Sequence, residues 1–266
     1  MKDILRELAE MRRRDAETRE ATVPLAEMMR LAESAPAPRD FAAAFAAAGR
    51  GDRTPPRVIA ELKRASPSEG MIRDDFRPVE LARELASAGA AALSVLCEPH
   101  MFLGGEEYLR AVRAEVDVPI LYKDFVSTRY QVAAARAAGA DAVLLIAAVL
   151  DDPTLKDLLA FAGGLGLSAL VETHDGKEIG RAVQAGARLV GVNCRDLRDF
   201  STDVSLLESL VPEIPRPCLR IAESGMHSAD AIRRARAAGA DGFLVGTVLM
   251  RAPHPGAMLR ALTANH

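Results

Sequence analysis

The sequence of 266 residues predicts a single (β/α)8 barrel, the TIM-barrel architecture of the α/β class, with an N-terminal helical extension. Three observations predict this fold. The tripeptide Ala-Gly-Ala recurs four times, each time after a helix-like stretch and before a short apolar run. Four further apolar runs alternate with these, which gives the eight units of a closed barrel. Charged side chains gather just after the runs, at the strand ends where such barrels place their sites.

The extension is expected to span residues 1–55, and the barrel residues 56–266. Apolar residues of the extension recur at helical spacing, and Pro24 is placed to begin a second helix. Asp40 is expected to cap an alanine-rich third helix that ends at Gly49. Nothing in the extension carries chemistry by itself, so the catalytic unit is expected to be the barrel.

The eight apolar runs are expected to be buried, parallel strands. A helix between two runs implies a right-handed βαβ connection, and the glycine of each Ala-Gly-Ala is expected to end the helix before it. A doubly wound open sheet is the alternative, but no glycine-rich dinucleotide loop follows the first run. The strands are expected to begin near residues 58, 92, 118, 142, 168, 188, 218 and 242.

The composition argues against several classes of partner. A formal net charge of -3 gives no electrostatic reason to expect nucleic acid or an anionic membrane. The three cysteines are an odd number without metal-ligand spacing, which is typical of a reduced protein. No signal peptide or membrane-spanning run follows the first residue, so a cytoplasmic location is expected. The histidines His100, His174 and His227 are scattered, and none is expected to bind a metal.

The first run, Val58–Leu62, ends in a pair of opposite charges. Glu61 and Lys63 are two residues apart, so on a strand both side chains point to the same face. Taken alone, the pair is equally consistent with a partly solvated ion pair and with a site. The other runs favour a site, because polar residues follow nearly all of them at the same predicted rim. In chain order these residues are Glu98, His100, Lys123, Asp124, Glu172, His174, Asn193, Arg195, Asp196, Glu223 and Ser224.

Some of these residues have a simpler structural interpretation. Glu98 is expected to pair with a lysine, and Asp124 and Asp196 to bond backbone groups of their own loops. Each of the other residues also has a structural interpretation when it is taken alone, but the set as a whole is hard to explain by chance. Facing charges on one rim reduce stability and are usually retained for function.

Two glycine-containing turns predict a phosphate site. Ser224-Gly225 follows the seventh run, and Gly246-Thr247 follows the eighth and opens a helix-like segment. Loops after strands seven and eight, with a short helix, form a recurrent phosphate site of this fold. Glycine lets the backbone approach an anion closely, although both glycines are also consistent with simple turns. A phosphorylated small-molecule substrate is therefore expected.

With these residues assembled, the chain resembles the indole-3-glycerol phosphate synthase family over nearly its whole length. Several long motifs in the family's order make the resemblance specific. Three positions depart from the family pattern: Cys194 replaces a more frequent asparagine, Tyr122 a basic residue, and Thr247 a serine. The motifs are IAELKRASPS at 59–68, SVL at 94–96, EPH at 98–100, KDF at 123–125, LVETH at 170–174, GVNCRDL at 191–197, AESG at 222–225 and FLVG at 243–246.

The resemblance implies an activity. Members of the family close the pyrrole ring of 1-(2-carboxyphenylamino)-1-deoxyribulose 5-phosphate, then remove carbon dioxide and water, in tryptophan biosynthesis and without a cofactor or metal. It implies Lys123 as general acid and Glu172 as general base, with Glu61 stabilising charge beside them. Lys63 would bridge anionic groups of the substrate, and the division of acid roles between the two lysines stays open. A lysine clustered with other cations has a lowered pKa, which is expected for Lys123.

The resemblance also implies binding roles. The N-terminal helices would pack over the barrel mouth, and the loop from Ser66 to Gly70 would close over the substrate. A weak association with other tryptophan-pathway enzymes is a further expectation. Catalytic support would come from Asn193 and Ser224, substrate binding from Ser66, Phe125, Leu144, Arg195 and Glu223, and phosphate binding from Lys63, Gly225, Gly246 and Thr247.

Two other functions stay open at this stage. One is a different phosphate-binding barrel such as phosphoribosylanthranilate isomerase, which needs one acid and one base. That reaction leaves the quartet of Glu61, Lys63, Lys123 and Glu172 unexplained. The other is a barrel that serves as a scaffold or ligand-binding subunit, which has no use for polar residues at nearly every strand end.

Overall fold

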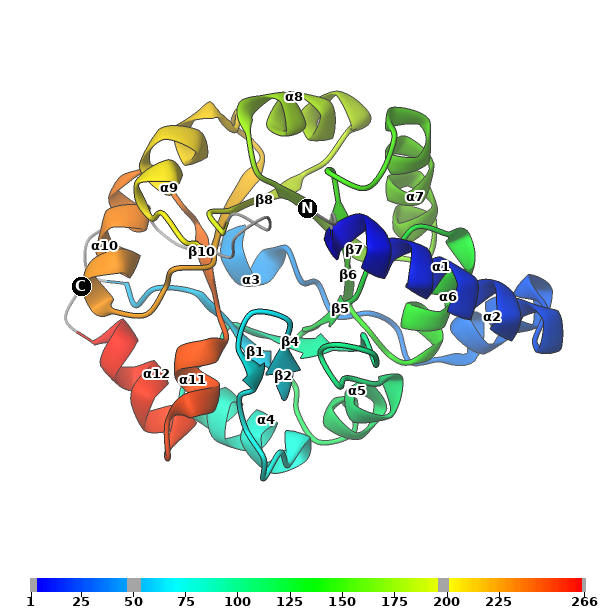
Figure 1. Ribbon diagram of the computed structural model, residues 1–266, viewed down its shortest axis with the longest axis horizontal. Helices are drawn as coiled ribbons and strands as arrows, with labels where there is room; N and C mark the ends of the chain where they lie inside the picture. The colour runs from blue at the N-terminus through cyan, green and yellow to red at the C-terminus, as the bar shows by residue number, and fades with distance from the viewer. Residues whose placement is uncertain (1–3, 47–53, 196–200, 265–266) are drawn as a thin grey trace.

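The computed structural model of the protein describes residues 4–46, 54–195 and 201–264. Eight parallel strands close into a barrel in the order β1-β10-β9-β8-β7-β6-β5-β4, and the outer helices form a ring around them (Figure 1). The predicted barrel is confirmed, and the open sheet is excluded. The barrel strands are β1 (Val58–Leu62), β4 (Ala92–Leu96), β5 (Ile120–Lys123), β6 (Ala142–Ile146), β7 (Ser168–Thr173), β8 (Leu189–Asn193), β9 (Leu219–Glu223) and β10 (Gly242–Val245).

Most strands begin within one residue of the predicted positions. The exception is β5, which begins at Ile120 and not near residue 118. The cause is Pro119, which has no N–H group to donate to a neighbouring strand. The carbonyl of Pro119 still accepts a hydrogen bond of 2.9 Å from the Leu93 N–H group.

Helices connect the strands, as the alternation predicts. The Ala-Gly-Ala glycines lie in the left-handed region, with φ between 91° and 101°, and end the helix before the strand. The helices of the barrel are α4 (Pro78–Ser87), α5 (Glu106–Arg113), α6 (Arg129–Ala137), α7 (Asp152–Gly164), α8 (Gly176–Ala185), α9 (Ser205–Leu210) with the 3-10 turn η1 (Val211–Glu213), α10 (Ala229–Ala237), α11 (Thr247–Arg251) and α12 (Pro255–Thr263).

Side chains alternate between two packed layers along each strand, as the period of two requires. In β1, Val58 and Ala60 pack outward among the helices, whereas Ile59 lies in the cluster that fills the barrel interior. Glu61 is next on the interior side and is buried with 4% exposure. The strand therefore carries its carboxylate into the C-terminal end of the barrel.

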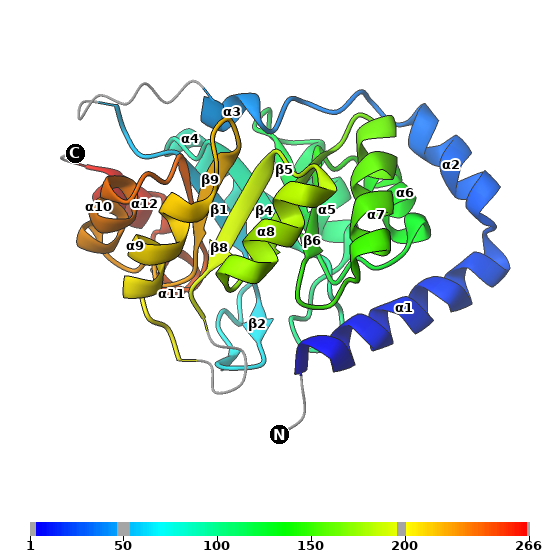
Figure 2. The same cartoon turned by 90° about the horizontal axis from the view of Figure 1, so that it is seen from above.

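The extension divides into three helices with different positions. The first, α1 (Ile4–Thr22), lies across the C-terminal end of the barrel, whereas α2 (Leu25–Ser34) packs on α6. The third, α3 (Ala43–Ala46), lies at the opposite end, where Phe45 contacts the start of β10 (Figure 2). We expected all these helices over the barrel mouth, but only α1 lies there.

The predicted helix boundaries of the extension agree in part with the structure. Pro24 directly precedes α2, as expected. The carboxylate of Asp40 accepts a hydrogen bond of 2.9 Å from the Ala43 N–H group, as a cap does. The predicted end of this helix at Gly49 lies outside the described residues. No helix in the described ranges has the length and apolar content to span a membrane.

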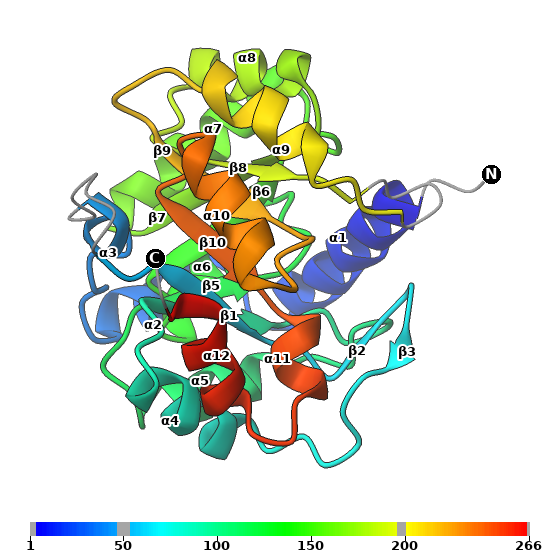
Figure 3. The ribbon, with the colours of Figure 1, turned by 90° about the vertical axis from the view of Figure 1, so that its left-hand side faces the viewer.

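A small antiparallel hairpin follows β1 and was not predicted. Its strands are β2 (Ala65–Ser66) and β3 (Gly70–Met71), and it projects beyond β1 on the side of α11 (Figure 3). Arg73, just after the hairpin, donates hydrogen bonds of 2.9 and 3.0 Å to the carbonyls of Met250 and Ala252. These two hydrogen bonds connect the segment after the hairpin to the C-terminal end of α11.

Candidate active site

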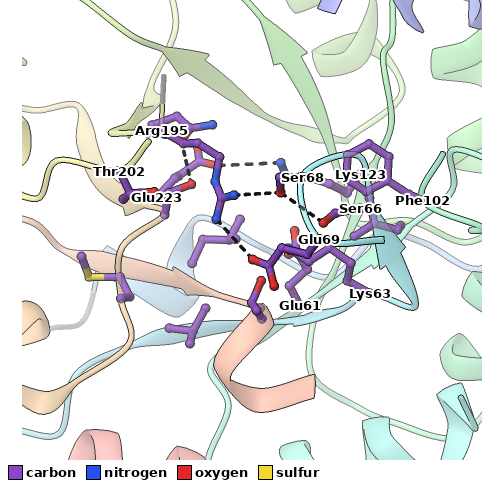
Figure 4. Close-up of a pocket in the computed structure, with 18 of the residues that line it drawn as sticks. Glu61, Lys63, Ser66, Ser68, Glu69, Phe102, Lys123, Arg195, Thr202 and Glu223 are labelled. Carbon is purple, nitrogen blue, oxygen red and sulfur yellow. Dashed lines mark hydrogen bonds and ion pairs between the residues drawn. The ribbon is translucent and has the colours of Figure 1, made fainter. Parts of the chain in front are cut away.

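A cavity of about 640 Å³ opens at the C-terminal ends of the strands (Figure 4). Parallel strands closed into a barrel bring all their carboxyl ends to one face, so residues far apart in the sequence meet there. Every predicted site residue lines this cavity: Glu61, Lys63, Ser66, Lys123, Phe125, Leu144, Glu172, Asn193, Arg195, Glu223, Ser224, Gly225, Gly246 and Thr247.

Lys123, at the end of β5, lies among carboxylates. Its Nζ atom is 3.3 Å from Oε2 of Glu172 and 3.9 Å from Oε2 of Glu223. Burial lowers the pKa of Lys123, but the charges of Glu172, Glu223 and Glu61 outweigh it and raise the pKa above its ordinary value. The expected lowering is therefore wrong, because the predicted neighbouring cations are not the charges nearest to this ammonium.

Glu61 and Lys63 form an ion pair inside the cavity. Nζ of Lys63 lies 2.8 Å from Oε2 of Glu61, and both side chains are largely buried. Burial raises the pKa of Glu61, but Lys63 and Lys123 outweigh it and the net shift is downward. The two interpretations of this pair are thus compatible, because the pair exists and also faces the cavity.

A polar chain fixes the carboxylate of Glu172 at the end of β7. Asn193 donates a hydrogen bond of 3.1 Å from Nδ2 to Oε1 of Glu172. The Oδ1 atom of Asn193 in turn accepts a bond of 2.7 Å from Ser224 Oγ, which sets the orientation of the amide. Burial raises the pKa of Glu172, but Lys123, His174 and Asn193 outweigh it, so its pKa is well below the usual range.

Glu223, at the end of β9, is buried with 1% exposure. Its Oε1 atom has no hydrogen-bond partner among the described residues. Burial, reinforced by the charge of Glu172, raises the pKa of Glu223 to about 8. A Cβ atom at Gly191 would lie 2.0 Å from this Oε1 atom, so only glycine leaves room for the carboxyl group.

The turns after β9 and β10 hold tightly packed glycines. Gly225 has φ of 70°, and a Cβ atom there would lie 2.8 Å from Cγ2 of Val204. Ser224 also lies in the left-handed region, with φ of 64°, where a side chain is strained. A Cβ atom at Gly246 would lie 2.2 Å from Oε2 of Glu61. These backbone segments are therefore held in one conformation at the cavity wall.

The hairpin loop after β2 crosses the cavity mouth (Figure 4). Arg195 Nη1 donates a hydrogen bond of 3.0 Å to Ser68 Oγ, and Arg195 Nη2 is 4.0 Å from Oε1 of Glu69. On the other side, Arg251 Nη2 lies 2.6 Å from Oε2 of Glu69. The loop thus bridges the end of β8 and the helix α11.

Several residues that shape the cavity were not singled out from the sequence. Three come from α1, Ile4, Leu5 and Leu8, and their spacing looked like an ordinary amphipathic helix. Phe102 is another, and its ring centroid lies 6.2 Å from that of Phe125. No signal in the sequence distinguishes these residues of α1 from those of any other amphipathic helix.

Glu98 and Asp124, for which we expected structural roles, have partners that agree only in part with the prediction. Among the described residues, Glu98 pairs with no lysine; its carboxylate accepts hydrogen bonds of 2.7 to 2.9 Å from the N–H groups of His100, Met101 and Phe102. Asp124 accepts a bond of 2.8 Å from the Phe125 N–H group, as expected, and also pairs with Arg12 of α1. Asp196 lies outside the described residues.

The described cysteines and histidines are not grouped as metal ligands. The free thiols are all buried, and burial raises the pKa of Cys194 to about 12, so this departure from the family pattern is a packing residue. Within the described ranges, no group of three or more histidine, cysteine, aspartate or glutamate side chains is arranged to hold a metal ion.

Comparison with known proteins places the chain in a family. The sequence model described as indole-3-glycerol phosphate synthase matches residues 5–262. Curated relatives with that name include those of Albidiferax ferrireducens, 44% identical over 264 residues and 99% of each chain, and of Acidithiobacillus ferrooxidans, 45% identical over 262 residues, 98% of this chain and 99% of the other. The relative from Micrococcus luteus is 46% identical over 264 residues, 98% of this chain and 97% of the other.

A solved structure supports the fold alone. Thiamine phosphate pyrophosphorylase from Pyrococcus furiosus superposes with a TM-score of 0.59 at 18% identity, over 80% of this chain and 95% of the other. The sequence matches are far more specific, because they run from α1 to α12 at well above 40% identity. The chain belongs to the indole-3-glycerol phosphate synthase family, the carboxy-lyase enzymes of tryptophan biosynthesis.

Proposed function

We propose that the protein converts 1-(2-carboxyphenylamino)-1-deoxyribulose 5-phosphate into indole-3-glycerol phosphate by general acid–base catalysis. The observation that carries this proposal is the contact of Lys123 with Glu172, with 3.3 Å between Nζ and Oε2, inside the cavity. A proton donor and a proton acceptor from different strands stand close enough to act on one substrate. Family membership supports the same reaction.

Lys123 is the proposed acid for ring closure. Attack of the aromatic ring carbon on the substrate's ketone develops an alkoxide, which needs a proton. The surrounding carboxylates keep Lys123 charged, so it offers both a proton and a positive charge to that oxygen. Carbon dioxide then leaves from the ring carbon that carried the carboxylate, and the bonding electrons restore the ring.

Glu172 is the proposed base for dehydration. This step removes a proton from the ring and a hydroxyl that leaves as water. The low pKa of Glu172 keeps it ionised, and a weak base suffices because the proton leaves a cationic ring. The departing hydroxyl takes its proton from Lys63 or Lys123, and Glu61 stabilises the charge of Lys63 at 2.8 Å.

The two ends of the cavity suit the two ends of the substrate. Phe125 and Leu144, with Leu8 of α1, form an apolar wall for the aromatic ring. At the other end, Gly246 precedes α11, whose first backbone N–H groups favour an anion, and Gly225 lies in the turn after β9. The phosphate would lie there, with Lys63, Arg195 and Thr247 as further contacts, and Ser66, Asn193, Glu223 and Ser224 would contact the central hydroxyls and carboxylate.

An assay tests the proposal directly. Purified protein mixed with the ribulose phosphate substrate, without added metal, is expected to develop indole fluorescence. Absence of product under these conditions would contradict the proposed function and favour the isomerase or scaffold interpretation. Cytoplasmic location and a weak association with other tryptophan-pathway enzymes stay predictions, which fractionation and sedimentation of mixed enzymes would check.

A further inference from the structure

His174 lies against the proposed base although it does not line the cavity. It follows Glu172 by two residues, directly after the last residue of β7. The Nε2 atom of His174 is 3.4 Å from Oε1 of Glu172, and the side chain of His174 is only 20% exposed. The histidine therefore contacts the carboxylate from the side away from the substrate cavity.

A second carboxylate holds the other edge of the ring. Nδ1 of His174 lies 3.1 Å from Oε2 of Glu178, which also accepts a bond of 2.8 Å from the His174 N–H group. The position of Glu178 is fixed by α8, because Asp175 caps that helix and accepts a bond of 2.8 Å from the Glu178 N–H group.

The two ring contacts favour the charged imidazole. Nδ1 of His174 is hydrogen-bonded to Glu178, whereas Nε2 lies within ion-pair distance of Glu172 without a hydrogen bond among the described residues, so two carboxylates favour the positively charged ring. Burial lowers the pKa of His174, but Glu172 and Glu178 outweigh it and raise the pKa to about 10. His174 is then a cation throughout the physiological range.

Glu172 consequently lies between two cations. Lys123 contacts Oε2 at 3.3 Å and His174 contacts Oε1 at 3.4 Å. His174 also interacts with Glu223 on β9: the positive charge of His174 lowers the pKa of the Glu223 carboxyl group. The charges around this histidine are therefore those of Glu172, Glu178 and Glu223, with Lys123 beyond the first of them.

We propose that His174 is a positioning residue for Glu172, which as an imidazolium anchored by Glu178 fixes Oε1 and keeps the carboxylate ionised, leaving Oε2 toward Lys123 and the substrate. This inference rests on the proposed function, because it takes Glu172 as the base. The division of the carboxylate oxygens follows from the contacts: Oε1 accepts a hydrogen bond from Asn193 and is paired with the charge of His174 at 3.4 Å, whereas Oε2 contacts Lys123.

Variants of His174 separate charge from position. His174→Gln keeps a neutral donor at a similar reach toward Glu172, whereas His174→Ala removes both the charge and the contact. In His174→Gln, the positive charge is lost while a polar contact remains, so kcat is expected to fall about threefold, less than in His174→Ala. In His174→Ala, kcat is expected to fall about tenfold or more at all pH values, with KM within about threefold of wild type.

The control for His174→Gln is the same substitution at another histidine that does not line the cavity. His254→Gln makes the same substitution at an exposed histidine before α12 and is expected to behave as wild type. A His174→Gln variant with the kcat of wild type would overturn the proposal, as would a change confined to KM. Wild-type protein without any activity would instead contradict the proposed function, and would leave the next measurement valid.

Proton NMR of the histidine rings tests the ion pairs without substrate or turnover. The chain has five histidines, so the resonance of His174 is identified by its loss in His174→Gln. The ring of His174 is expected to remain protonated above pH 8, and Glu178→Gln is expected to lower its titration point. A wild-type resonance that titrates near the ordinary value of about 6.5 would overturn the proposal.

Discussion

Nζ of Lys123 lies 3.3 Å from Oε2 of Glu172, although the two residues are 49 positions apart and come from strands separated by β6. Two groups at this distance partly neutralise each other. For one to give a proton and the other to take one, the reacting atoms must contact both, which restricts the substrate to the space above this pair. The proposed acid and base are therefore tested best by removing each charge separately.

Lys123→Met and Glu172→Gln are each expected to lower kcat by roughly 10²–10⁴-fold, because each removes one side of the proton transfer. Steady-state kinetics with the ribulose phosphate substrate measures the effect. Lys156→Met, at an exposed position of α7, is the matched control and should leave kcat unchanged. Variants that keep turnover within a few-fold of wild type would show that the roles are wrong even though the family is right.

Glu223→Gln is expected to be more stable than wild type at alkaline pH. Because the pKa of Glu223 is raised to about 8, the folded protein holds a proton there that the unfolded chain releases near pH 4.5. In wild type, this proton contributes to the free energy of unfolding. The contribution is fully present below pH 4.5 and is lost as pH rises through 8. Glutamine resembles the protonated acid at every pH.

Thermal melts from pH 5 to 9 measure this effect. The melting temperature of Glu223→Gln minus that of wild type should increase by a few degrees across the window, since 1 kcal/mol corresponds to roughly 2–4 °C for a chain of similar size. Titrating groups remote from Glu223 are common to both proteins and cancel in the difference. A difference that stays constant with pH would contradict the raised pKa.

The fold could be predicted because its signals are local. Each Ala-Gly-Ala glycine needs a left-handed conformation, and each apolar run needs burial, whatever the rest of the chain does. The position of the candidate residues could be predicted for a related reason: once the strands are placed, Glu61, Lys123 and Glu172 must share the C-terminal face, whereas their roles stay predictions.

The neighbours within that face could not be predicted. Which charge lies nearest to Lys123 depends on how the closed barrel spaces β1, β7 and β9, and no local pattern contains this spacing. Likewise, Leu8 of α1 has the sequence context of any amphipathic helix, and only tertiary packing shows that it lines the cavity. Tertiary packing also decides that α1 lies at the C-terminal end of the barrel and α3 at the opposite end, and the sequence pattern of neither helix contains this information.

Thr247→Val is expected to raise KM about tenfold with little change in kcat, if its hydroxyl binds the phosphate, which does not react. Gly246→Ala should affect both parameters, because its Cβ atom would lie 2.2 Å from Oε2 of Glu61 and 3.2 Å from Nζ of Lys63. Comparing the two variants separates phosphate binding from displacement of the ion pair. An unchanged KM for Thr247→Val would move the phosphate elsewhere.

Arg12→Met is expected to release α1 from the mouth of the barrel. The guanidinium of Arg12 donates to both carboxylate oxygens of Asp124, from Nε at 3.0 Å and from Nη2 at 2.7 Å. The side chain of Asp124 is fully buried, so loss of its partner leaves an uncompensated charge, which costs up to about 3–5 kcal/mol in buried pairs. Detachment of α1 lowers this cost by admitting water, and it removes Leu5 and Leu8 from the cavity wall.

The kinetic signature of that release is a rise in KM of about tenfold with a smaller change in kcat, because the lost contacts hold the aromatic ring and not the reacting groups. Arg14→Met is the matched control, since Arg14 lies on the same helix but is exposed and pairs only with Glu10 among the described residues. The double variant Arg12→Met with Asp124→Asn should recover part of the melting temperature, because no buried charge remains, but not the KM. Equal KM values for Arg12→Met and Arg14→Met would show that α1 does not hold the substrate.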